Sequence, residues 1–196
     1  MDIILPGTSH SLLFETKKII PDSQKSSRVL LSIPKKMGSL ALDFIRHAFL
    51  TFFPKKELYI LLFLRLGYRH GPSVMNMLTN DIVNTLTKVV THLNKESHLF
   101  KGFVRFSILN NALVAEIAPK NYVLPLLTQH FCQRYPEEQF LIYDKTHHMA
   151  LVYQPYQSAI IPLDDLELPE ADENEQAFRK LWKIFYDSIE IKGRHN

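Results

Sequence analysis

The sequence predicts an α+β fold, in which a helical first half is followed by an antiparallel sheet in ββαβββ order with helices packed against it. Two observations support this prediction. Apolar residues recur at helical spacing through residues 22–99, whereas runs rich in β-branched and aromatic residues follow Gly102. We therefore expect a helical region over residues 1–99 and an antiparallel α+β region over residues 100–196, joined in one compact unit.

Four main helices are expected in the first half, because each apolar pattern is bounded by a capping residue or a breaker. Asp22 or Ser23 caps the first helix, and Pro34 stops it. Gly67 closes the third helix, and Asn80 opens the fourth. The expected ranges are 22–33, 40–53, 54–66 and 80–99, with a short helical segment before the last.

Strand-like runs dominate the second half. The first two runs are separated by Asn110-Asn111, and asparagine tolerates the left-handed backbone region, so a tight hairpin is expected. Asn121 is expected to cap a helix that ends at Arg134, and a last helix covers residues 175–191. The apolar stripe of that last helix consists of Phe178, Leu181, Trp182, Phe185 and Ile189. The five expected strands cover residues 103–109, 113–117, 140–143, 149–153 and 158–161.

Composition limits the class of protein. Hydrophobic residues make up 46% and charged residues 22% of the chain, which is typical of a globular protein. The sequence has no apolar run near the roughly 20 residues that span a bilayer and no export signal. Its single cysteine, Cys132, excludes an intrachain disulfide, so we expect a cytoplasmic protein without membrane contact. Residues 1–70 hold 11 Lys/Arg against 5 Asp/Glu, which suits phosphate contacts or simply a solvated surface.

The helical and strand patterns meet in a segment that reads ESHLFKGFVRF, residues 96–106. Its glycine breaks the helical period, and a hinge there would present His98, Lys101 and Arg105 together. Lys101 and Arg105 suit contacts with nucleic-acid phosphates or bases, and His98 suits proton transfer near neutral pH. The alternative is that the three side chains cap the helix and pair with acidic neighbours such as Glu96.

The same segment, written Glu-x-His-x-Phe-Lys-Gly-Phe-x-Arg-Phe, resembles the hallmark of a bacterial family assigned to DNA metabolism or repair. The molecular activity of that family is not established. Further landmarks of the family occur here in the same order: Ala118-Pro119, residues 123–127, His130-Phe131, Arg134-Tyr135, residues 142–144 and residues 181–189. The resemblance is looser in the first half, where it starts near Ser26.

This resemblance implies a role in DNA metabolism or repair more firmly than it implies any particular chemical reaction. Genes of the family often stand beside that of a radical-SAM protein, and its domain also occurs fused to uracil-DNA glycosylases. The resemblance thus implies DNA and a radical-SAM protein as partners. Relatives usually open with a segment containing Tyr-Asp-Gly and continue past the position of Asn196 into a basic tail. We therefore expect this chain to be shortened at both ends, without any nucleic-acid contacts that the tail contributes.

Three further residues are candidates for a second site. Arg134 is a candidate for nucleic-acid contact, Tyr143 for substrate binding and Asp144 for proton transfer. The structural alternatives are that Arg134 compensates a helix dipole and that Tyr143 and Asp144 form the next turn. His130-x-Cys132 and His147-His148 contain zinc-ligand types, but their spacing is not that of a zinc motif. We expect His130 to be a core histidine and no metal to be bound.

Three functions remain open at this point. No Walker loop, dinucleotide-binding glycine motif, HExxH sequence or radical-SAM cysteine cluster is present, so we expect no cofactor. The leading hypothesis is a nucleic-acid-binding accessory protein of DNA repair or metabolism that acts with a radical-SAM partner. One alternative is an enzyme that acts on DNA or a modified base with His98 or Asp144 in proton transfer. The other is a purely structural adaptor.

Overall fold

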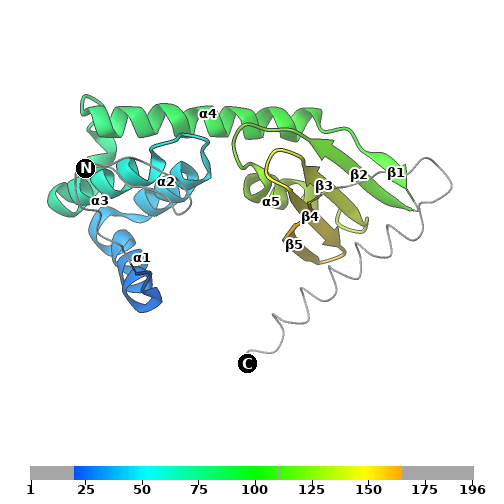
Figure 1. Cartoon of the computed structure of the whole chain (residues 1–196), viewed down its shortest axis with the longest axis horizontal. Helices are drawn as coiled ribbons and strands as arrows, with labels where there is room; N and C mark the ends of the chain where they lie inside the picture. Colours follow the sequence, from blue (N-terminus) through cyan, green and yellow to red (C-terminus); the bar gives the residue numbers. More distant parts are fainter. Residues whose placement is uncertain (1–19, 110, 165–196) are drawn as a thin grey trace, which may run out of the picture. The chain divides into compact units, whose positions relative to one another are not determined.

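The computed structural model describes residues 20–109 and 111–164 and confirms an α+β fold (Figure 1). The chain divides into two compact units, and the division falls between His92 and Leu93, inside a helix. We describe each unit by itself. The helix expected over residues 175–191 lies outside the described residues.

The first unit is helical, as predicted. It contains α1 (Ser23–Met37), α2 (Ser39–Leu50), α3 (Lys56–His70), the 3-10 helix η1 (Gly71–Asn76) and the first part of α4 (Asp81–Phe103). Two predicted caps are confirmed. The Asp22 carboxylate accepts the backbone N–H of Lys25 at 2.9 Å, and Asn80 accepts that of Ile82 at 3.0 Å. The core of this unit includes Ile33, Met37, Ala41, Ile45, Ala48, Phe63, Val74, Val83, Leu86 and Val90.

Two predicted helix ends in this unit are wrong. Helix α1 continues through Pro34 to Met37. A proline disfavours a helix, but the burial of Met37 stabilises this last turn. Helix α3 continues through Gly67 to His70 and ends at Gly71, whose φ of 64° is left-handed. Gly67 is therefore a packing residue, because an added Cβ would lie only 1.9 Å from Cε of Met37.

The second unit contains a five-stranded sheet in the order β1-β2-β3-β4-β5. Its strands are β1 (Ser107–Leu109), β2 (Ala112–Ile117), β3 (Phe140–Asp144), β4 (Met149–Gln154) and β5 (Gln157–Pro162). The predicted hairpin between β1 and β2 is confirmed, with Leu109 opposite Ala112 and Asn111 at a φ of 63°. All neighbouring pairs are antiparallel except β2 and β3, which are parallel.

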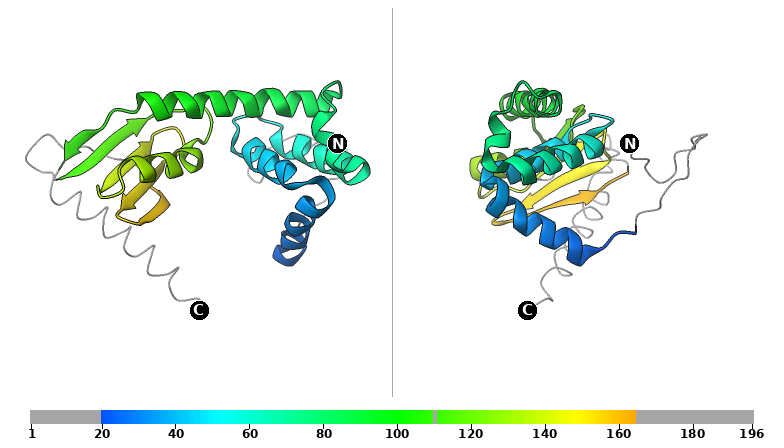
Figure 2. Two further views of the ribbon diagram at one scale, coloured as in Figure 1. Left: turned by 180° about the vertical axis from the view of Figure 1, so that it is seen from behind. Right: turned by 90° about the vertical axis from the view of Figure 1, so that its left-hand side faces the viewer.

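The sheet is thus mixed, and the expectation of a purely antiparallel sheet needs this correction. Helix α5 (Leu124–Arg134) connects β2 to β3 and forms the crossover that parallel neighbours require. Figure 2 shows α5 on one side of the sheet. Phe131 of α5 packs edge-to-face on Phe140 of β3, with ring centroids 6.4 Å apart. Residue Val123, not Asn121, holds the N-cap position of α5.

Helix α4 extends to Phe103, four residues beyond the expected end near Leu99. Gly102 is therefore helical, and the expected hinge at this glycine is wrong. The strand β1 begins only at Ser107, after a short irregular connection. Among the helices that the structure describes, none combines the length and the apolar character needed to cross a lipid bilayer.

Candidate functional site

The parallel strands β2 and β3 end side by side. Ile117 stands opposite Asp144, and the N–H of Lys145 donates to the carbonyl of Ile117 at 3.0 Å. Because both strands end at this edge, the segments that follow them also start there. These are residues 118–123, which lead into α5, and the turn 145–148, which leads into β4. In open sheets with parallel strands, the carboxyl ends are the usual place for a ligand.

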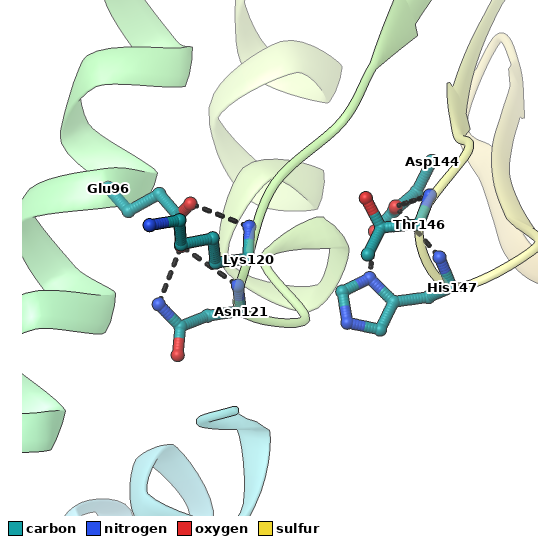
Figure 3. A network of polar contacts seen from close by, with 6 residues as sticks. All are labelled: Glu96, Lys120, Asn121, Asp144, Thr146 and His147. Carbon is teal, nitrogen blue, oxygen red and sulfur yellow. Dashed lines mark hydrogen bonds and ion pairs between the residues drawn. The ribbon is translucent and has the colours of Figure 1, made fainter. Parts of the chain in front are cut away.

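A buried carboxylate organises the turn after β3. Asp144 is fully buried, and its Oδ1 accepts the backbone N–H groups of Thr146 at 3.0 Å and His147 at 3.1 Å. Its Oδ2 lies 2.7 Å from Nδ1 of the His147 ring (Figure 3). An aspartate that ends a strand closes such turns readily because its short side chain reaches amides two and three residues ahead. The local sequence therefore delivers an Asp–His pair to the edge of the sheet.

The electrostatics of this pair follow from burial. Burial raises the pKa of Asp144, and the hydrogen bonds and charge of His147, with the N–H of Thr146, offset only part of that rise. The ring of Tyr122 lies against His147, with ring centroids 5.3 Å apart. Burial raises the pKa of Tyr122 as well, and the nearby charge of Asp144 raises it further. Tyr122, Asp144 and His147 thus form one titratable cluster, named here the Asp144 cluster.

A second carboxylate holds the loop that carries Tyr122. Glu96, from the part of α4 that belongs to this unit, accepts the backbone N–H of Lys120 at 2.8 Å and that of Asn121 at 3.0 Å. It also accepts the side-chain amide of Asn121 at 2.6 Å (Figure 3). Asn121, expected to cap α5, instead uses its buried side chain to bind Glu96. Glu96 therefore fixes the loop at the same edge as the Asp144 cluster.

The structure places the predicted cations on and after the end of α4. His98 and Lys101 are three residues apart in the helix and so lie on neighbouring positions of one face. Arg105 lies in the irregular connection to β1. His98 and Arg105 are exposed and Lys101 is half-buried. Within residues 20–109 and 111–164, none of the three side chains makes a hydrogen bond or an ion pair.

Arg134 and Tyr143 are placed apart from the Asp144 cluster. Arg134 is exposed at the end of α5, where its Nε donates to the hydroxyl of Tyr135 at 3.3 Å and its guanidinium lies 5.7 Å from that ring. Tyr143 is buried, and its hydroxyl donates to the carbonyl of Asp164 at 3.0 Å. Consecutive strand residues point to opposite faces, so Tyr143 and Asp144 do not share a site.

The remaining histidines and the cysteine do not assemble into a metal centre in the part of the chain that the structure describes. No group of three His, Cys, Asp or Glu side chains there is arranged to hold a metal ion. Nδ1 of His148 lies 2.8 Å from the carbonyl of Asp164, and the buried Nε2 of His130 has no hydrogen-bond partner within residues 20–109 and 111–164. Burial raises the pKa of the Cys132 thiol, which makes the reactive thiolate less available.

Sequence reasoning identified Asp144 but missed the role of His147, which was considered only as a zinc ligand. The signal was present as Asp-x-x-His directly after a buried strand, a spacing that a turn can close. It was also present in the strand–helix–strand order, which brings residues 118–123 to the same edge. The site as observed is therefore an Asp–His pair at the carboxyl ends of two parallel strands.

The fold and this edge define an α+β protein with a mixed sheet. The chain belongs to a family described as a domain of unknown function, DUF4130, which matches residues 54–196. A comparison with curated proteins and one with solved structures give no match.

Proposed function

We propose that this protein binds nucleic acid in DNA repair or DNA metabolism, as an accessory factor of a radical-SAM partner. The observation that carries the proposal is the set of three cationic or titratable side chains, His98, Lys101 and Arg105, which have no partner among the described residues. The resemblance of residues 96–106 to a bacterial DNA metabolism family supports the same function.

Unpaired cations suit this role for a physical reason. A lysine or arginine already bonded to a carboxylate must give up that partner before it binds a phosphate, whereas Lys101 and Arg105 have no such partner among the described residues. Each phosphate contact releases condensed counterions, so binding of this kind weakens steeply with salt. Arg134, exposed and stacked on Tyr135, would add a further contact in the same unit.

Fluorescence anisotropy with labelled single-stranded and duplex DNA tests the proposal. The double variant Lys101→Ala with Arg105→Ala should bind more weakly, and its plot of log affinity against log salt should lose about two units of slope. The matched control is Lys25→Ala with Arg46→Ala. It removes the same charge, but from residues that are paired with Asp22 and Asp43. Equal affinity and equal salt slope in the wild type and the first variant would refute this site.

The partner is tested separately. The protein and the proposed radical-SAM partner should associate in analytical ultracentrifugation, and the complex should bind DNA more tightly than either protein alone. Association without any DNA binding would instead favour the structural-adaptor function. A catalytic function is favoured by a different observation, the Asp144 cluster, and is developed next.

A further inference from the structure

The carboxylate of Asp144 leaves one position on the His147 ring available for chemistry. The turn is already closed by Oδ1, which accepts two backbone N–H groups, so Oδ2 is not needed to close it. Oδ2 is instead bonded to Nδ1 of His147. With a carboxylate as acceptor, the neutral ring carries its proton on Nδ1 and an electron pair on Nε2. The His147 side chain is 26% exposed, so it is also reached by solvent.

We propose that His147 is a general acid–base residue for hydrolysis of phosphodiesters, with Asp144 as its positioning residue. The substrate class, a nucleic acid, rests on the proposed function. Residues 118–123 would supply the rest of the site, because Tyr122 of this segment lies against the His147 ring.

The chemical step needs no further reactant. Nε2 of His147 takes a proton from a water molecule while the water oxygen forms a bond to phosphorus. The bond from phosphorus to the leaving alcohol oxygen breaks, and the imidazolium returns the proton to that oxygen. The products are a phosphate monoester and an alcohol. The carboxylate of Asp144 stabilises the imidazolium in between.

The turn and the loop before α5 also carry the other titratable side chains near this ring. Asp144 faces Nδ1 from the end of β3, and Tyr122 faces the ring from the loop before α5. Lys145 in the turn is paired with Glu116 of β2. The neighbouring His148 is exposed, and its Nδ1 is engaged by the carbonyl of Asp164. His148 thus provides a matched control, because it is a histidine of the same turn whose Nδ1 faces a backbone carbonyl and not a carboxylate.

Asp144→Asn tests whether Asp144 positions the His147 ring. The measured quantity is the tautomer of that ring, which a purely structural role of Asp144 would leave unchanged. The asparagine carbonyl would keep the two backbone N–H groups that Oδ1 binds, so its NH₂ would have to face Nδ1 of His147. The neutral ring should then carry its proton on Nε2. Long-range ¹⁵N–¹H NMR of labelled protein distinguishes the two tautomers. Retention of the Nδ1–H tautomer in the variant, or its absence from the wild type, would overturn the positioning role.

Cleavage of fluorescein-labelled single-stranded DNA, duplex DNA and single-stranded RNA, with Mg²⁺ and with EDTA, tests the catalytic role. His147→Gln and Asp144→Asn should each lower the rate constant of cleavage by about 10²–10⁴-fold. His148→Gln should leave it unchanged. Anisotropy should show the same DNA affinity for all of these variants, since none removes a proposed DNA-binding cation.

The two proposals fail in different ways. A wild-type protein that binds these oligonucleotides but cleaves none of them would overturn the catalytic inference and leave nucleic-acid binding standing. Cleavage that persists at the wild-type rate in His147→Gln would identify a contaminating nuclease and overturn the inference as well. A protein that neither binds nor cleaves them would refute both.

Discussion

Met37 fills the space that a side chain at position 67 would need. A Cβ built on Gly67 lies 1.9 Å from Cε and 2.6 Å from Sδ of Met37, and both residues are buried. Gly67→Ala should force the end of the Met37 side chain to move, at a cost of about 1–3 kcal/mol. The better helix propensity of alanine offsets up to about 1 kcal/mol of that cost within α3, so the protein should be destabilised by about 0–2 kcal/mol. Urea denaturation measures the change.

Gly102→Ala should stabilise the protein, in contrast to Gly67→Ala. Gly102 is helical, and no atom of the described residues lies within 4 Å of a Cβ built there. Alanine loses less backbone freedom than glycine when a helix forms, so this variant should be more stable by up to about 1 kcal/mol. A loss of stability in this variant would show that position 102 needs a conformation other than the helical one.

Glu96→Ala should destabilise the loop before α5. The substitution leaves two backbone N–H groups and the amide of Asn121 without the carboxylate that binds them. Loss of such charge-assisted hydrogen bonds predicts a cost of about 2–4 kcal/mol in urea denaturation. The control is Glu138→Ala, an exposed position, which should change stability by less than about 0.5 kcal/mol. Equal effects of the two substitutions would contradict a structural role of Glu96.

Asp144 should make stability fall as pH rises through the acid range. Burial raises its folded-state pKa above the ordinary 3.8, so the folded chain holds the proton where the unfolded chain has released it. Stability that Asp144 contributes below about pH 3.8 should therefore be lost as pH rises through the higher folded-state pKa. The wild type should lose stability relative to Asp144→Asn over that window in denaturant titrations. A relative gain would mean that the pairing with His147 outweighs burial.

Trp182 lies outside the described residues and remains a prediction from the sequence. It occupies the centre of the apolar stripe of residues 175–191, which is expected to pack on the sheet. Trp182→Ala should then destabilise the protein by about 3–5 kcal/mol. Unchanged thermal stability in that variant would favour a base-stacking role for the tryptophan instead.

Local signals predicted the elements better than their ends. The Asp22 and Asn80 caps and the Asn111 hairpin depend on chemistry within a few residues, and the structure confirms them. The ends at Pro34 and Gly67 depended on packing between distant segments, which local propensity does not contain. The parallel pairing of β2 and β3 was implicit in the helix between them, but strand patterns alone do not give direction.

The candidate site shows the same division. Asp144 was a candidate because it ends an expected strand within a family landmark, residues 142–144, and Lys101 and Arg105 were candidates chiefly by family resemblance. The bond from Asp144 to His147 and the contact of His147 with Tyr122 depend on a turn and a crossover. The turn is a local feature that the Asp-x-x-His spacing indicates, whereas the crossover is a tertiary feature, so residue types alone could not place Tyr122 beside the pair.

The carbonyl of Asp164 contacts residues at both ends of the turn after β3, and these contacts limit the length of that turn. It accepts the hydroxyl of Tyr143 and lies 2.8 Å from Nδ1 of His148, and these two residues flank the Asp144–His147 pair. An inserted or deleted residue between positions 143 and 148 would break the contacts of Tyr143 and His148 with this carbonyl. It would also break the hydrogen bond between Asp144 and His147. We therefore expect natural relatives to tolerate length changes at the exposed residues 136–139 but to keep the length of this turn constant.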